Sequence, residues 1–264
     1  MQRIIILLTA VVIGMGLMGL ATVQAETNEV VAVPRAMAQA TVQMTMIQVQ
    51  GETRTTARGI GTLMQVDNNL LLVTHDHWPQ LQTPMGPDIV FFYDVNGKLL
   101  GELNGRSFFQ HLLFKDSGTL LLRPPDFVLA QSLPVQMGDL VDLQVGDTVT
   151  VMRRQPSNDN QLVSLAMVVT AVDATIGIPI LTLRSLDGSS IEPGDSGGGV
   201  WLNGRLVGNM WMTIRAESNN WLSGTVIKST DQSQAAGLTT IVAELAQMSL
   251  QSYEMPSVSL ETPS

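Results

Sequence analysis

A glycine-rich segment near residue 196 contains the residue types that acyl-transfer chemistry needs. It reads Gly194-Asp195-Ser196-Gly197-Gly198 and lies between two stretches that predict strands. A serine hydroxyl becomes a nucleophile when a tight turn exposes it beside a base, with backbone N–H groups in place to bind the oxyanion. Because glycine has no Cβ, the amide of Gly194 can turn toward the same point as the amide of Ser196. The segment therefore predicts Ser196 as a nucleophile and these two amides as its oxyanion hole, with a plain surface turn as the alternative.

The composition limits the classes of partner. The chain has 264 residues, no cysteine, 45% hydrophobic residues and a formal net charge of −9. This length is enough for one large or two small domains with a hydrophobic core. Apart from the pair Arg153-Arg154, the sequence has no cluster of basic residues. The acidic balance therefore argues against nucleic acid and against anionic membrane surfaces as partners.

The N-terminus predicts export. Arg3 precedes an apolar run over residues 4–21, and the small-residue exit Val23-Gln24-Ala25 follows it. This pattern is typical of a secretory signal peptide, here residues 1–25, cut after Ala25. An uncleaved anchor is the alternative, because about 18 apolar residues are near the lower bound for a membrane span. We therefore expect a periplasmic or secreted protein that leaves the membrane once the signal is removed.

The central part of the chain predicts two consecutive series of short strands. Apolar and polar residues alternate with a period of two, and turn residues separate the runs. The first series comprises residues 41–49, 61–66, 70–74, 88–93, 98–103 and 119–122. The second comprises residues 148–153, 162–172, 180–183, 199–202, 206–211 and 222–228.

These two series predict an all-β fold of two antiparallel six-stranded β-barrels. The break at Pro124-Pro125-Asp126 divides an N-terminal barrel over 41–125 from a C-terminal barrel over 126–248. A helical period appears only in residues 239–248 and predicts a C-terminal helix. We expect residues 26–40 to form an extended leader or short pro-segment that packs loosely, and residues 249–264 to form a flexible tail.

Three motifs in the chain order His, Asp, Ser resemble the trypsin/chymotrypsin-like serine proteases, and the resemblance covers nearly all of residues 41–248. Thr74-His75-Asp76-His77 is similar to that family's strand ending in Thr-x-x-His. The segment from Asp116 to Leu122 is similar to its Asp-x-Ala-x-Leu segment, and residues 194–198 match its Gly-Asp-Ser-Gly-Gly. Trp78 and Glu192 stand where animal members carry cysteines, so the resemblance is to the disulfide-free bacterial type.

The resemblance implies a role for each motif. It implies His77 as general base and then general acid, Asp116 as the carboxylate that orients the imidazole, and Ser196 as the nucleophile. No metal or organic cofactor is implied. Asp116 is preferred because it alone enters an apolar strand, where a carboxylate could be buried against an imidazole. The other candidates in the same half are Asp88, Asp94 and Asp126.

Asp195 requires a structural partner. In the resembling family this carboxylate is buried in an ion pair that holds the oxyanion loop, and a buried charge without a partner is costly. The Ile-Val-Gly-Gly sequence, with which trypsin-like zymogens supply an N-terminal amine, is absent here. We therefore expect Arg153 or Arg154 to pair with Asp195, as an internal arginine does in some bacterial relatives, without proteolytic activation.

The resemblance also implies a substrate pocket. Ser190, six residues before Ser196, falls at its base, and Trp211 and Thr213 stand where many relatives have Ser and Gly. A neutral hydroxyl cannot compensate a buried Lys or Arg side chain of the substrate. With Thr213 narrowing the pocket, we expect cleavage after small or medium apolar residues.

The leading interpretation is an exported serine endopeptidase that acts on a protein or peptide substrate. The first alternative is a catalytically inactive protease-fold binding module, in which residues 211–213 block the cleft. The second is a metal-dependent hydrolase, because neutral imidazoles two residues apart on a strand, such as His75 and His77, face the same side. No third ligand stands at metal-site spacing in the sequence. The sequence makes no prediction of the oligomeric state.

Overall fold

The structure, a computed structural model, describes residues 33–116, 118–138, 142–155, 158–173, 179–220 and 224–238. The predicted signal peptide (1–25), the predicted helix (239–248) and the predicted tail (249–264) lie outside the described residues. Among the residues that are described, no helix is long and apolar enough to span a membrane.

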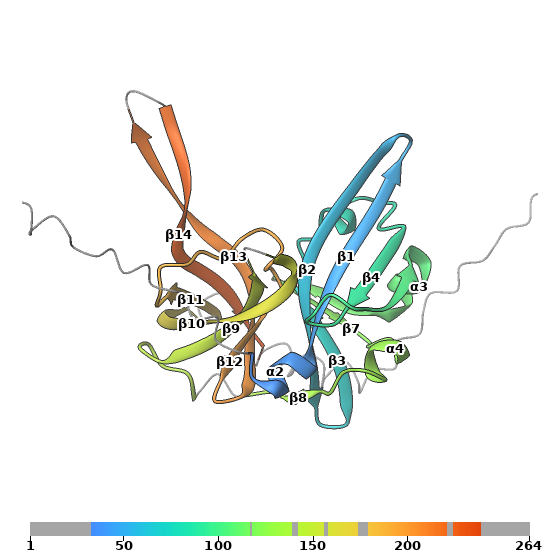
Figure 1. Cartoon of the computed structure of the whole chain (residues 1–264), viewed down its shortest axis with the longest axis horizontal. Helices are drawn as coiled ribbons and strands as arrows, with labels where there is room; N and C mark the ends of the chain where they lie inside the picture. Colours follow the sequence, from blue (N-terminus) through green and yellow to red (C-terminus); the bar gives the residue numbers. More distant parts are fainter. Residues whose placement is uncertain are drawn as a thin grey trace, which may run out of the picture. The chain divides into compact units, whose positions relative to one another are not determined.

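The strands of the first half form one sheet, which Figure 1 shows. Along the sheet the order is β5-β4-β1-β2-β3-β7-β6, and β8 pairs with β2. The strands are β1 (Thr41–Gln50), β2 (Thr53–Val66), β3 (Asn69–Thr74), β4 (Ile89–Tyr93), β5 (Leu99–Asn104), β6 (Leu112–Asp116), β7 (Thr119–Leu122) and β8 (Val135–Gln136). The described helical segments are α2 (Arg35–Ala40), η1 (Pro79–Gln82), α3 (Gly105–His111) and α4 (Asp126–Leu129).

The strands of the second half form a closed barrel of six strands in the order β10-β11-β14-β13-β12-β9. They are β9 (Thr148–Gln155), β10 (Asn158–Asp173), β11 (Ile180–Ser185), β12 (Gly199–Leu202), β13 (Arg205–Asn220) and β14 (Gly224–Gly237). The predicted all-β fold is thus confirmed, and so are the six strands of the second barrel. The first sheet has eight strands rather than six. The additional strands are β6, which begins with three consecutive apolar residues and shows no alternation, and β8, which has only two residues.

The hairpin of β1 and β2 is longer than the sequence predicts. Strand β2 begins at Thr53 rather than at residue 61, and the register pairs Thr53 with Gln50. The side chains of residues 53–56 are exposed, so this part of the strand has no apolar face for the sequence to reveal. Figure 1 shows the hairpin projecting beyond β4.

Residues 35–40 differ from the expected loose leader. They form helix α2, in which Met37 and Ala40 are buried and join a cluster of core side chains. The hydroxyl of Thr41 donates to the carbonyl of Met37 at 2.7 Å. The expectation of an extended, loosely packed segment is therefore wrong for α2, because the spacing of Met37 and Ala40 fits one helical turn against the core.

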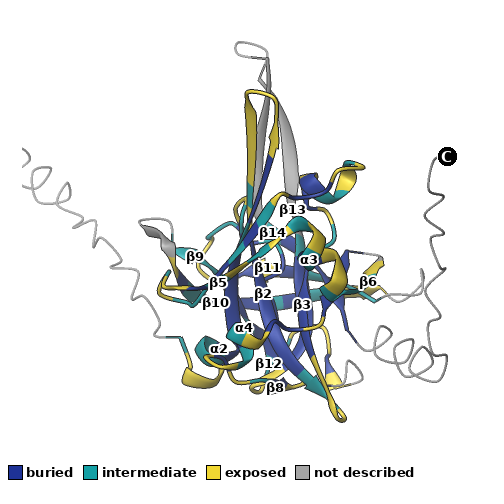
Figure 2. Cartoon of the chain, turned by 90° about the vertical axis from the view of Figure 1, so that its right-hand side faces the viewer, coloured by how far each residue is buried: buried dark blue, intermediate teal, exposed yellow. Residues whose placement is uncertain are grey.

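The two halves share a hydrophobic core. One cluster of buried side chains includes Ile60 and Val73 from the first sheet together with Met152 and Trp201 from the barrel. Figure 2 shows the buried residues along β2 and β3. This shared core packs β2 and β3 of the first sheet against β9 and β12 of the barrel.

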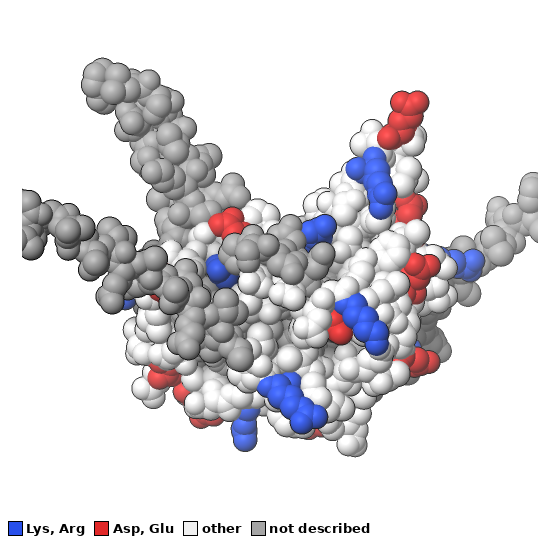
Figure 3. All heavy atoms as spheres, viewed as in Figure 1, with Lys and Arg blue, Asp and Glu red and all other residues white. Residues whose placement is uncertain are grey.

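Acidic and basic side chains occur on the molecular surface. Figure 3 shows acidic and basic side chains interspersed on the face that it displays.

Candidate active site

Backbone hydrogen bonds place Ser196 between the two halves. The carbonyl of Ser196 accepts from the amide of Ile60 in β2 at 2.9 Å. On the barrel side, the amide of Gly197 donates to the carbonyl of Met210 at 2.8 Å, and the amide of Met210 donates to Gly198 at 2.8 Å. The glycine-rich loop is therefore held against β2 and β13 at the same time.

Glycine is required at residue 197 for two reasons. Its φ is +85°, and a Cβ there would lie 2.1 Å from the carbonyl oxygen of Ile60 and 2.4 Å from Oγ1 of Thr74. Both atoms are fixed, because the hydroxyl of Thr74 donates to the carbonyl of Ile60 at 2.6 Å. Any side chain at Gly197 would push the nucleophile loop away from β2.

The amides of Gly194 and Ser196 are available to a ligand. Gly194 has φ +103°, a conformation that L side chains rarely adopt. Neither amide donates to an acceptor among the described residues, whereas the intervening amide of Asp195 donates to the carbonyl of Glu192 at 3.0 Å. Two neighbouring N–H groups without a partner can together stabilise an oxyanion.

His77 lies within hydrogen-bond distance of the predicted nucleophile. It follows β3 in a loop, and its Nε2 is 3.2 Å from Oγ of Ser196. The side chain of His77 is 42% exposed, so a substrate can reach it. With a proton on Nδ1, the imidazole has Nε2 free to accept from the serine hydroxyl.

Asp76 is a functional candidate that the sequence analysis missed. Its Oδ1 lies 3.8 Å from Nδ1 of His77, and its Oδ2 accepts from the amide of Gly118 at 3.0 Å. Burial raises the pKa of Asp76, but the His77 imidazole and the Gly118 amide outweigh it, so that this pKa lies below its ordinary value. The signal in the sequence was the position of Asp76 directly before His77.

Asp116, the predicted orienting carboxylate, ends strand β6. Its backbone pairs with Thr119 across the turn to β7, and its side chain lies outside the described residues. The role of Asp116 therefore stays a prediction.

The turn after Asp116 is held from several sides. The side-chain Nδ2 of Asn209 donates to the backbone carbonyl of Gly118 at 3.2 Å, and the hydroxyl of Thr119 donates to the side-chain Oδ1 of Asn209 at 3.1 Å. The indole of half-buried Trp211 lies over Gly118, where an added Cβ would stand 3.2 Å from the ring. Trp211 therefore covers the turn whose amide holds Asp76.

His75 is buried beside His77. It is 3% exposed and stacks on Trp78, with ring centroids 4.3 Å apart, while its centroid lies 4.2 Å from that of His77. Burial, and to a lesser extent the charge of His77, hold the pKa of His75 well below its ordinary value. The described part of the chain contains no group of three His, Cys, Asp or Glu residues that could hold a metal.

Asp195 is buried with backbone partners. Its carboxylate accepts from the amides of Arg154 and Glu192 at 2.7 and 2.8 Å, and the residue is 1% exposed. Burial raises the pKa of Asp195, whereas these two amides and the charges of Arg153 and Arg154 oppose the rise. The structure modifies the predicted ion pair: the close contacts of the carboxylate are amides, and the guanidinium charges act at longer range.

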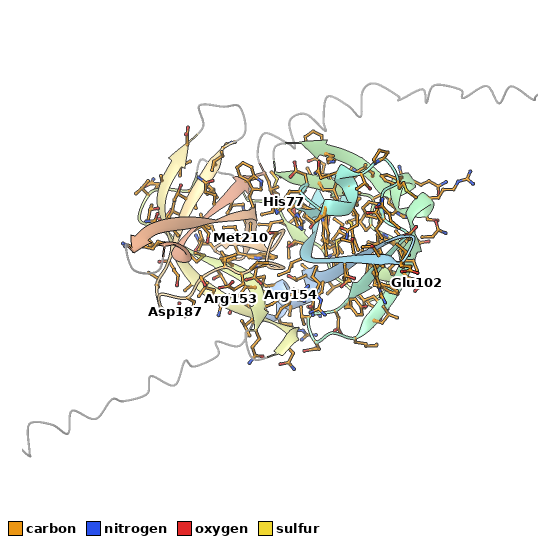
Figure 4. All side chains as sticks on the ribbon, turned by 90° about the horizontal axis from the view of Figure 1, so that it is seen from above. His77, Glu102, Arg153, Arg154, Asp187 and Met210 are labelled. Atoms are coloured by element: carbon orange, nitrogen blue, oxygen red, sulfur yellow. The ribbon has the colours of Figure 1, made fainter. Side chains whose placement is uncertain are left out.

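The side chain of Arg154 connects the glycine-rich loop at Gly194 with the first sheet. Its Nε donates to the carbonyl of Gly194 at 3.1 Å. Its Nη1 donates to Oε1 of Gln43 in β1 at 2.6 Å, and its Nη2 donates to the carbonyl of Gly59 in β2 at 3.2 Å. Figure 4 shows Arg154 beside the strands of the first half. Arg154 thus fixes the peptide that follows Gly194.

Arg153 lies beside the predicted substrate pocket. Its Nη1 donates to the carbonyl of Ser190 at 2.8 Å, and the hydroxyl of Ser190 donates to the carboxylate of exposed Glu192. The backbone of Thr213 pairs with Ser233 in β14, and the Thr213 side chain lies outside the described residues. The pocket therefore stays a prediction.

Comparisons with known proteins agree with this architecture. No protein-family model matches the sequence, and no curated protein matches it. Among solved structures, an inactive mutant of Rv3671c from M. tuberculosis H37Rv is similar, with a TM-score of 0.50 and 14% identity over 83% of this chain and 90% of the other. The HtrA-type protease AlgW, solved with a decapeptide, has a TM-score of 0.54 and 14% identity over 81% of this chain.

The match to AlgW spans 64% of that protein, so this chain corresponds to only part of it. At this level of identity the comparisons show the fold, which is that of the trypsin-like serine proteases.

Proposed function

We propose that this protein is an exported serine endopeptidase that hydrolyses peptide bonds through an acyl-enzyme. One observation carries the proposal: Ser196 Oγ lies 3.2 Å from Nε2 of His77, on a loop where the amides of Gly194 and Ser196 have no acceptor among the described residues and can bind an oxyanion. The fold of trypsin-like serine proteases supports the same reaction class. The sequence of residues 1–25 supports export.

In the first half of the reaction, Nε2 of His77 takes the proton of Ser196 as Oγ attacks the substrate carbonyl carbon. The carbonyl oxygen becomes an oxyanion and accepts from the amides of Gly194 and Ser196. The imidazolium then gives its proton to the leaving amine, and the peptide bond breaks. Water repeats these steps on the acyl-enzyme, with His77 again as base. From the sequence, Asp116 is the candidate for the carboxylate that orients His77.

The oxyanion loop needs no proteolytic activation in this proposal. The carbonyl of Gly194 is bound by Arg154, and the carboxylate of Asp195 is bound by two amides. These contacts come from within the chain and hold both sides of the loop. If this protein becomes active only after proteolysis creates a new N-terminus within residues 33–116, this part of the proposal is wrong.

Replacing Arg154 by methionine should lower kcat by about 10²-fold, comparable to losing one oxyanion-hole donor. Methionine keeps most of the aliphatic part of the arginine side chain. It removes the guanidinium that donates to oxygens of Gly194, Gln43 and Gly59. Steady-state kinetics and urea unfolding measure the effect, with an expected loss of about 1–3 kcal/mol in the free energy of unfolding. Arg153→Met, which loses a donor to Ser190, is the control and should lower kcat much less. Wild-type kcat in Arg154→Met would refute the role.

Cleavage should follow small or medium apolar residues rather than Lys or Arg. A basic side chain that reached Ser190 would approach the guanidinium of Arg153, which binds the Ser190 carbonyl. Glu192 is exposed, and ion pairs with exposed carboxylates contribute only about 0–1 kcal/mol. We therefore expect a preference of about tenfold or more for the apolar residues.

A peptide library with products identified by mass spectrometry tests both the activity and this preference. Glu192→Gln is the matched control and should change the ratio by no more than about threefold. A dominant preference for Arg or Lys would refute the neutral pocket, and one for Phe or Tyr would refute the narrowing by Thr213. If the folded protein cleaves no peptide in the library, the endopeptidase proposal itself fails.

A further inference from the structure

Strand β13 contacts all three motif segments of the candidate site. Its backbone at Met210 binds the nucleophile loop, because the amide of Gly197 donates to the Met210 carbonyl and the Met210 amide donates to Gly198. The preceding residue, Asn209, is buried, and its side chain forms hydrogen bonds with the other two segments. Two neighbouring residues of one strand therefore connect the three motifs.

The side-chain amide of Asn209 binds both segments through hydrogen bonds. Its Nδ2 donates to the backbone carbonyl of Thr74, the last residue of β3, at 3.4 Å. The same Nδ2 donates to the backbone carbonyl of Gly118 at 3.2 Å. Its Oδ1 accepts from the hydroxyl of Thr119 at 3.1 Å, and this bond orients the amide so that Nδ2 faces the two carbonyls.

These contacts lie close to the predicted catalytic residues in the chain. Thr74 is three residues before His77, and Gly118 is two residues after Asp116. The pairing of β3 with β7 brings these two segments together. The side chain of Asn209 then ties both of them to the barrel that carries the nucleophile.

The polar groups at this junction are shielded from solvent. Asn209, Thr74 and Thr119 are all 0% exposed. A buried carbonyl or hydroxyl that loses its hydrogen bond destabilises the arrangement around it, so the turn would move to recover a partner. A displacement of about 1 Å at catalytic groups can lower a rate by about 10²-fold. The position of this turn therefore matters for any chemistry at the site.

We propose that Asn209 is a positioning residue that holds the segments of His77 and Asp116 at the spacing that catalysis at Ser196 requires. This inference deepens the proposed function and rests on it for its kinetic consequence. The attachment of the turn at Gly118, however, can be measured without any turnover. The two claims can therefore fail separately.

The first measurement is hydrogen exchange at the amide of Gly118, followed by NMR in the full chain. Gly118 is buried and its amide donates to Oδ2 of Asp76, so exchange requires the turn to open. Asn209→Leu keeps a side chain of similar size but removes all three hydrogen bonds of the amide. We expect exchange at Gly118 to become faster by about tenfold or more.

Gln48→Leu is the matched control. Gln48 is also a buried amide, and its Nε2 donates to Oγ1 of Thr83 and to the carbonyl of Gly86, both at 2.7 Å. It has no described contact with the three motif segments. Its replacement should lower the urea midpoint of unfolding to a similar degree, while exchange at Gly118 stays within about twofold of wild type.

Thr119→Val is a second variant, which keeps the test available if Asn209→Leu does not fold. Valine has nearly the shape of threonine but lacks the hydroxyl that binds Oδ1 of Asn209. We expect exchange at Gly118 to become about threefold faster or more. The effects of the two replacements should not add, because both break the same hydrogen-bond network.

The second measurement is steady-state kinetics with a cleaved peptide. Asn209→Leu should lower kcat by about 10–100-fold and change KM by no more than about threefold, whereas Gln48→Leu should keep both values close to wild type. Unchanged exchange at Gly118 in Asn209→Leu and Thr119→Val, or a kcat in Asn209→Leu no lower than in Gln48→Leu, overturns the inference. If exchange becomes faster but the wild-type protein cleaves no peptide, Asn209 still holds the turn and the proposed function is what fails.

Discussion

Replacing Ser196 by alanine is expected to lower kcat by about 10⁶-fold, because the proposed acyl-enzyme forms on its hydroxyl. Activity above the uncatalysed rate should persist at about 10³–10⁴-fold, since the amides of Gly194 and Ser196 still bind the oxyanion. The fold should be unaffected, because the hydroxyl is half-buried in a loop and its described contact is with His77.

Kinetics with a cleaved peptide and a thermal unfolding curve measure these two effects. Gly197→Ala is the contrasting variant, because its Cβ would meet the carbonyl of Ile60 and should lower both activity and Tm. A Ser196→Ala protein that keeps wild-type turnover would show that Ser196 is not the nucleophile.

Replacing His77 by alanine should reduce kcat by a similar factor of about 10⁶, and combining it with Ser196→Ala should cost almost nothing more. In the proposed mechanism Ser196 and His77 act as one unit, since the hydroxyl attacks only when Nε2, 3.2 Å away, takes its proton. Losses of this kind are not additive. The measurement is kcat for both single variants and the double variant.

His111→Ala is the control for the loss of an imidazole. His111 is the last residue of helix α3, and its Nδ1 lies 2.7 Å from the carbonyl of Arg123. Its ring has no described contact with Ser196. Its kcat should stay close to wild type. If the double variant instead multiplies the losses of the single variants, His77 and Ser196 do not act on the same step.

The turn of the glycine-rich loop was predictable because its backbone geometry requires glycine. Gly197 is needed for a positive φ and for the close approach to Ile60, so the glycines mark both the turn and the candidate site. The alternation of Val42, Met44 and Met46 likewise predicts β1, since these side chains lie in the core of the first half.

Other features depend on contacts between distant residues. The side chain of Asp76 is held by the amide of Gly118, which lies 42 residues later in the chain. No pattern in the sequence around Asp76 predicts that hydrogen bond. Arg153 or Arg154 was predicted to pair with Asp195 through its charge; both charges do act on the carboxylate, but its described hydrogen bonds come from the backbone amides of Arg154 and Glu192. The guanidinium of Arg154 reaches Gln43, 111 residues away in the chain.

Strand β2 shows a different limit of sequence interpretation. Its first residues are polar and exposed, and they are a strand only because β1 pairs with them. A pattern of apolar residues detects burial, so it misses strands that are stabilised by pairing alone.

The most direct test of the central claim is labelling of the folded protein with a fluorophosphonate. Oγ of Ser196 would attack the phosphorus atom, fluoride would leave, and His77 would take the proton of the hydroxyl. We predict one label per chain, located on Ser196 by mass spectrometry, and none in Ser196→Ala or in protein unfolded in urea. Folded wild-type protein that remains unlabelled would contradict the claim and favour a protease-fold binding module without catalytic activity.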